Sequence, residues 1–115
     1  MNHAGGLQKH CELALPDWLG PFLADWRQPL DTDERRMRLA VALAGENVSR
    51  RTGGPFAALV VEDRRGRLLG AGVNRVTALG LSLAHAEILA LSFAQCAIAD
   101  WNLGSQGPVQ LVTSC

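Results

Sequence analysis

At 115 residues the chain is long enough for one small domain, and its 11 Lys and Arg residues balance its 11 Asp and Glu residues. Without net charge there is no reason to expect nucleic acid or an anionic membrane surface as a partner. Because no apolar run approaches the roughly 18 residues that span a bilayer, and because three widely spaced cysteines make a poor disulfide framework, we expect a cytoplasmic protein.

Residues 1–30 are predicted to be an N-terminal extension of unknown role. The first fifteen residues lack the pattern of a signal peptide. Three prolines follow, which break any long helix, while the apolar residues between them recur at helical spacing. The pattern predicts one or two short helical turns that cover the domain's own surface. Binding of a partner by Trp18 and Trp26 is the alternative.

The main domain, residues 31–115, is predicted to begin with an amphipathic helix. Asp31 and Glu34 have the spacing of a capping box, in which each side chain accepts from a free backbone N–H at the helix start. Apolar residues then repeat on one face of the helix, at Met37, Ala40, Val41, Ala44 and Val48. The glycine pair Gly53 and Gly54 suits the chain reversal that ends this element.

Two strands, a second helix and a third strand follow in the sequence. Residues 56–61 form a short apolar run that predicts a strand buried on both faces, and residues 68–73 return as a second strand after a polar turn. The helix predicted over about residues 84–98 is apolar nearly all round, which predicts a buried helix. A third strand begins at Val109. This order of elements predicts a three-layer α/β arrangement.

Two ionisable residues, His85 and Glu87, lie two apart at the start of that apolar helix. A helix N-terminus favours a carboxylate, and a neutral imidazole can bind zinc while the carboxylate exchanges protons with the metal's water. The alternative is that His-x-Glu occurs here by chance and that Glu87 only stabilises the first turn of the helix.

Five segments carry a resemblance to a known family: "RLAVALAGENV", "GGPFAALVV", "GAGVNRVT", "AHAEILAL" and "LVTSC". With them the sequence resembles the cytidine deaminase-like superfamily, in the branch of bacterial guanine deaminases and tRNA adenosine deaminases. The resemblance implies a three-layer α/β/α sandwich whose last strands and helices are missing from this chain. Residues 31–115 would then be the N-terminal part of a CMP/dCMP-type deaminase domain.

The same resemblance implies roles for individual residues. His85 is expected to be a zinc ligand and Glu87 the catalytic proton shuttle, as in nucleobase deaminases that carry His-x-Glu and a later Pro-Cys-x-x-Cys. Asn74 and the backbone N–H of Ala86 are expected to bind the substrate. The alternative for Asn74 is an ordinary turn residue at the end of a strand.

The sequence departs from the family pattern at its end and just before His85. The family's two ligand cysteines follow the Thr-Ser-Cys segment, whereas this chain stops at Cys115, for which no ligand role is expected. Cys96 lies roughly 16 Å from His85 along the helix, at 1.5 Å per residue, and is predicted to be a core residue. Residues 81–84 replace the family's Asn-Asp-Pro-Thr, which bears on substrate choice. The simplest expectation is that the 115 residues are the front part of a longer deaminase.

We therefore expect the complete protein to be a zinc-dependent hydrolytic deaminase of a purine base or nucleoside. The segments "GGPF" and "TSC" favour guanine, although Pro55 and Phe56 themselves are expected to serve strand entry and packing. A homodimer is implied by the resemblance, and nucleic acid is not an expected partner. The alternative is a zinc-free, degenerate deaminase fold that acts as a binding or oligomerisation module.

Overall fold

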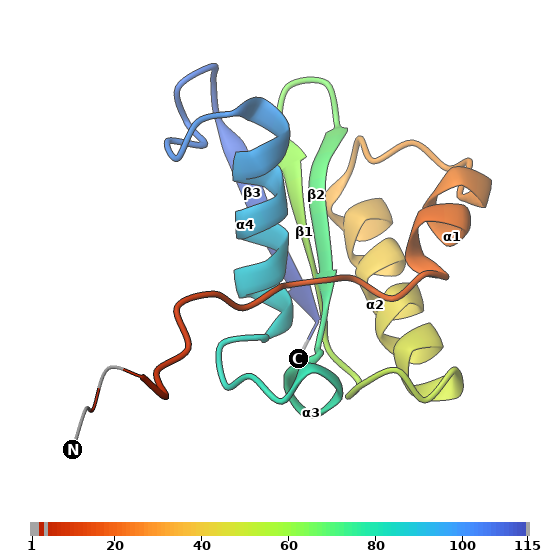
Figure 1. Ribbon diagram of the computed structural model, residues 1–115. Helices are drawn as coiled ribbons and strands as arrows, with labels where there is room; N and C mark the ends of the chain where they lie inside the picture. Colours follow the sequence, from red (N-terminus) through yellow and green to blue (C-terminus); the bar gives the residue numbers. More distant parts are fainter. Residues whose placement is uncertain (1–2, 4, 115) are drawn as a thin grey trace.

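The computed structural model describes residues 3 and 5–114, and it shows a three-stranded sheet between helices (Figure 1). The strands are β1 (Ala57–Glu62), β2 (Arg67–Val73) and β3 (Val109–Ser114), in the order β2-β1-β3 with both pairings antiparallel. The helices are α1 (Leu19–Asp25), α2 (Asp33–Ser49), α3 (Val76–Leu79) and α4 (Ala86–Ile98). Among the described residues, no helix combines the length and apolar character needed to cross a membrane.

The central strand β1 supplies a core on each face of the sheet. Ala57, Leu59 and Val61 pack in a cluster with α2, while Ala58 and Val60 pack in a second cluster with α4. Figure 1 shows α2 and α4 on opposite sides of the sheet. The prediction of a strand buried on both faces is thus confirmed, and so is the three-layer α/β arrangement. The short helix α3, which ends at Gly80 with φ 68°, lies where the sequence predicted only a loop.

Helix α2 differs from its prediction at its start and in its buried face. Its N-cap is Thr32, whose side chain accepts a hydrogen bond from the backbone N–H of Arg35 at 3.1 Å, so the predicted Asp31–Glu34 capping box is wrong. Three of the residues expected to be buried, Met37, Val41 and Val48, are exposed instead. The buried residues are Arg36, Leu39, Ala40, Leu43, Ala44 and Asn47. The inward face therefore lies about one residue earlier than the apolar pattern predicted, because it includes two polar residues.

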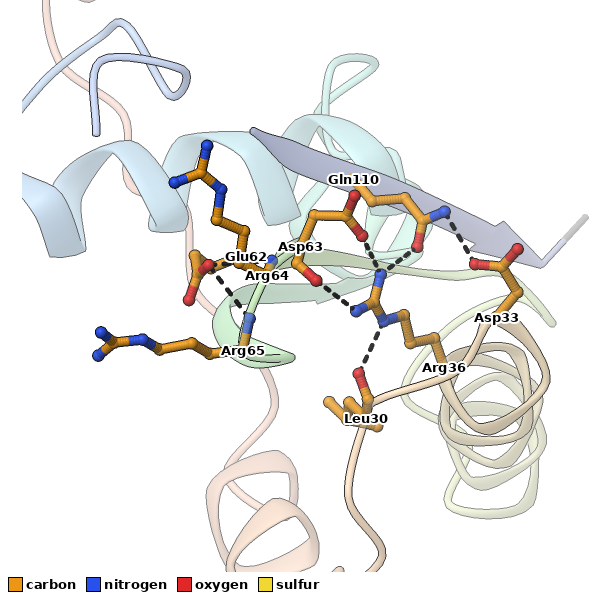
Figure 2. Close-up of polar contacts among 8 residues, drawn as sticks. All are labelled: Leu30, Asp33, Arg36, Glu62, Asp63, Arg64, Arg65 and Gln110. Carbon is orange, nitrogen blue, oxygen red and sulfur yellow. Dashed lines mark hydrogen bonds and ion pairs between the residues drawn. The ribbon is translucent and has the colours of Figure 1, made fainter. Parts of the chain in front are cut away.

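Arg36 is one of these buried polar residues, and it ties α2 to the sheet (Figure 2). Its guanidinium donates to the Leu30 carbonyl at 2.8 Å, to the Asp63 carboxylate at 2.7 Å and to the Gln110 side chain at 2.7 Å. Gln110 in turn donates to Asp33 at 3.1 Å. One side chain thus connects the segment before α2, the turn after β1 and the strand β3.

Helix α4 is buried on one face only, which corrects the prediction of a fully buried helix. Ala86, Leu89, Ala90 and Ala94 face the sheet. Ile88 and Cys96 are exposed, so the prediction of Cys96 as a core residue is also wrong. The helix approaches β2 closely at Gly70 and Gly72, where an added Cβ would overlap atoms of α4. The apolar sequence of α4 is compatible with burial of every face of the helix, but the sheet covers only one face.

The segment before α2 covers the domain's own surface, as predicted. Trp18, Phe22 and Trp26 are partly buried against the core cluster on the α2 side. Their rings contact one another, with centroids 5.8 Å apart for Trp18 and Phe22 and 5.9 Å apart for Phe22 and Trp26. Aromatic side chains arranged in this way bury a large apolar area.

Candidate active site

A cavity of about 480 Å³ lies where the N-terminus of α4 meets one end of the sheet. It brings together all four residues that were predicted to form the site: Asn74, His85, Ala86 and Glu87. Two further segments supply the rest of its lining, which consists of Phe56, Ala57, Thr113 and Ser114. A cavity of this size is within the range of small-molecule sites.

The N-terminus of α4 places His85 and Glu87 at the cavity. His85 is the N-cap residue, with extended backbone (φ −74°, ψ 153°), and its side chain makes no capping hydrogen bond. It is exposed, so the imidazole is free to meet a ligand. Glu87 is half-buried in the first turn, where the positive end of the helix dipole favours a carboxylate. Ala86 is the first helical residue, and its backbone N–H therefore has no acceptor within the helix.

Asn74 lies directly after β2 and lines the same cavity as His85 and Glu87. Its backbone N–H donates to the Phe56 carbonyl at 3.0 Å, which holds it beside the start of β1. Its side-chain oxygen accepts from the Val76 N–H at 3.4 Å. Among the described residues the carboxamide nitrogen has no acceptor, which leaves a donor available to a bound molecule.

The four other lining residues were not recognised as site residues from the sequence. Phe56 was expected to be a packing residue, but it is 41% exposed and lies at the cavity, just before β1 begins. Ser114 closes another side, where its hydroxyl accepts from the Ala57 N–H at 3.1 Å. The sequence shows one continuous apolar run from Phe56 to Val61, and nothing in this run indicates that Phe56 lies before the start of the strand.

A catalytic zinc ion takes three protein ligands, so side chains near His85 would have to supply two more. The part of the chain that the structure describes contains no group of three or more His, Cys, Asp or Glu side chains able to hold a metal. Cys11 and Cys96 are both exposed and neither lines the cavity. Cys115, for which no ligand role was expected, lies outside the described residues. His85 by itself therefore does not make a complete zinc site.

Comparison with known proteins identifies the family. The family model of the cytidine and deoxycytidylate deaminase zinc-binding region matches residues 30–112, which is most of the chain. The chain belongs to this family. Zinc is thus the cofactor of the family, and the cytidine deaminase-like fold predicted from the five sequence segments is confirmed.

Guanine deaminases are among the similar proteins. The guanine deaminase of Bacillus subtilis (strain 168) is 37% identical over 82 residues, which are 71% of this chain and 49% of that protein. The solved structure of guanine deaminase from Nitrosomonas europaea is 38% identical with a TM-score of 0.81, over 96% of this chain and 60% of that one. A structure solved with 2,6-diaminopurine is 40% identical with a TM-score of 0.80, over 90% and 55% of the two chains.

This deaminase-family chain spans about half the length of the curated relative and somewhat more of the solved ones. A tRNA:A34 deaminase, which edits A to I at the wobble position, is also similar, at 28% identity and a TM-score of 0.60 over 70% of this chain. Identity and structural similarity are both higher for the guanine deaminases than for the tRNA enzyme.

Proposed function

We propose that the full protein is a hydrolytic deaminase of a purine base, with guanine as the first substrate to test. The observation that carries this proposal is the cavity that gathers Asn74, His85, Ala86 and Glu87. The guanine deaminases of Bacillus subtilis and Nitrosomonas europaea, and relatives solved with 2,6-diaminopurine and 8-azaguanine, support a purine as the bound molecule.

In this proposal Asn74 and Ala86 bind the substrate, and Glu87 transfers protons. Asn74 donates its carboxamide N–H to the base, and the N–H of Ala86 binds an acceptor on the base edge. The oxygen of a water molecule adds to the ring carbon that carries the amino group. Glu87 takes the proton that the water loses and delivers it to the ring nitrogen; it then takes the proton of the newly attached hydroxyl group and delivers it to the departing amine as the carbonyl forms. The C–N bond breaks, so that one water is consumed and one ammonia is released.

Zinc dependence is part of this proposal, and it is supported by His85 and by the family to which the chain belongs. His85 is the ligand-type imidazole that the described residues place at the cavity. These residues do not by themselves satisfy a catalytic zinc ion, so the roles above concern only the protein's own groups. The homodimer, the cytoplasmic location and the division at residues 30 and 31 are likewise proposals.

The experiment compares two glutamates that occupy the same position in different helices. Glu87 is the second residue of α4, and Glu34 is the second residue of α2 and lies on the exposed surface. We expect Glu87→Gln to lower kcat for ammonia release from guanine by roughly 10²–10⁴-fold, the usual contribution of a general acid–base. Glu34→Gln, which removes an equivalent helix-dipole interaction, should leave kcat unchanged.

A substrate panel of guanine, adenosine, cytosine and tRNA would be assayed on the full protein together with its zinc content. Normal deamination by Glu87→Gln would contradict the assignment of the proton shuttle. A folded protein that holds no zinc and releases ammonia from none of these substrates would instead favour a binding or oligomerisation module.

A further inference from the structure

Asn47 is a completely buried polar residue in the last turn of α2 (0% exposed). Buried amides are costly unless they are hydrogen-bonded. The Asn47 carboxamide nitrogen donates to the carbonyl oxygens of Gly54 and Asn74, both at 2.9 Å. Its oxygen accepts from the Thr52 hydroxyl at 2.7 Å. Both amide hydrogens and the amide oxygen are therefore in use, which a side chain of another type could not reproduce in the same space.

The two carbonyls that Asn47 holds belong to the segment that leads into β1 and to the residue that follows β2, and both of these segments contribute lining residues to the cavity. Asn74 is thereby fixed at both of its backbone groups, since its N–H is held by Phe56 and its carbonyl by Asn47. The backbone at Gly53 packs directly against the same carbonyl, so that a Cβ at Gly53 would overlap it. The position of the Asn74 side chain in the cavity thus follows from a buried amide that does not itself line the cavity.

Thr52 connects this arrangement to the N-terminal segment. Its hydroxyl O–H donates to Asn47, and its hydroxyl oxygen accepts from the indole N–H of Trp18 at 2.9 Å. Arg75, next to Asn74, donates to the Thr52 carbonyl at 2.8 Å and to the Ala14 carbonyl at 3.4 Å. The N-terminal segment is therefore hydrogen-bonded to Thr52 through Trp18 and to Arg75 through Ala14, although both partners lie far from it in the sequence.

We propose that Asn47 is a positioning residue for Asn74, and that the Thr52 hydroxyl orients the Asn47 amide and links it to Trp18. The inference rests on the proposed function, because the binding of a purine by Asn74 is part of that proposal. Since Glu87 is carried by α4 and has no contact with this network, loss of the network should weaken substrate binding rather than proton transfer.

The test uses two substitutions at Thr52, of which only one retains the hydroxyl, and one substitution at Asn47. Thr52→Val removes the hydroxyl, whereas Thr52→Ser retains it. Asn47→Asp retains the acceptor for Thr52 but puts a carboxylate oxygen against two carbonyls. In guanine deamination by the full protein we expect Thr52→Val and Asn47→Asp to raise KM roughly tenfold with kcat little changed, as for lost ground-state binding. Thr52→Ser should restore the wild-type KM.

A second measurement does not depend on activity. The amide of Asn74 donates to Phe56, and its exchange with deuterium reports local opening of this region. We expect Thr52→Val to speed exchange at Asn74 roughly tenfold relative to Thr52→Ser, with exchange at Leu43 in the middle of α2 unchanged. A purely structural contribution of Thr52 would instead change the exchange of both amides together.

The outcomes separate the two proposals. If the wild-type protein deaminates guanine and both Thr52→Val and Asn47→Asp keep its KM, Asn47 is not a positioning residue. If the wild-type protein deaminates no purine, the proposed function fails, and the exchange rate of Asn74 then decides the inference. If Asn47→Asp does not fold, the Thr52 pair decides it, and equal exchange at Asn74 in the two Thr52 variants overturns it.

Discussion

At the scale of single residues, the clearest contrast is between His85 with Glu87 and the buried polar residues of α2. The first pair could be recognised from the sequence because two ionisable groups stand at the start of an apolar helix, a position that favours a carboxylate. Arg36 and Asn47 gave no such signal. Polar residues are expected on the outside of a helix, and these two are inside because partners from distant segments satisfy them.

Arg36 leads to a prediction about stability with a control on the same helix. Arg36→Ala leaves the carbonyls of Leu30 and Asp63 without their charged donor, and we expect the free energy of unfolding to fall by about 2–4 kcal/mol. Arg38→Ala breaks only an exposed pair with Glu34, which is worth about 0–1 kcal/mol. Urea denaturation measures both, and equal losses in the two variants would show that the buried position of Arg36 contributes nothing special.

At the scale of elements, the positions of the strands followed from the sequence better than the orientation of the helices. The predicted strands over 56–61 and 68–73 match β1 and β2 to within one residue at every boundary. The two long helices were predicted in the right places, but their buried faces were not, and the short helix α3 was missed. An apolar pattern shows that a helix has an inward face, while the neighbouring elements decide how much of the helix is covered.

The packing of α4 on β2 predicts the effect of one added methyl group. A Cβ at Gly72 would overlap the backbone of Ala86, so Gly72→Ala must push the N-terminal half of α4, with His85 and Glu87, away from the sheet. We expect a loss of about 1–3 kcal/mol or more, as for other overpacked cores. Gly45→Ala meets no atoms within 4 Å and should gain about 0.5–1 kcal/mol from helix propensity. Thermal unfolding of both variants checks this, and a Gly72→Ala protein as stable as the wild type would contradict it.

At the scale of the whole molecule, the layers do not cover the sheet evenly. Helix α4 packs mainly on β2 and β1, so the side of β3 that faces the α4 layer is poorly covered, and Leu111 is 44% exposed there. In the described part of the chain β3 is also an edge strand, with β1 as its neighbour. An exposed edge that carries apolar side chains favours association with another chain.

This surface predicts concentration-dependent self-association of the 115-residue chain. A lysine on an edge strand opposes such pairing, so Leu111→Lys should shift the protein toward the monomer in sedimentation velocity. Val48→Lys replaces a similarly exposed apolar residue on α2, away from β3, and should leave association unchanged. If both variants associate as the wild type does, the edge of β3 is not the surface responsible.

The sequence by itself determined the three strands, the two long helices, the three-layer order and the proximity of His85, Ala86, Glu87 and Asn74 at one cavity, because these depend on local patterns and on segments shared with a family. The tertiary structure decided that Asn47 and Arg36 lie inside, that Cys96 lies outside and that Phe56 lines the cavity. The physical reason is that burial and hydrogen-bond satisfaction depend on partners distant in the chain, such as the Asn74 carbonyl that Asn47 holds from 27 residues away.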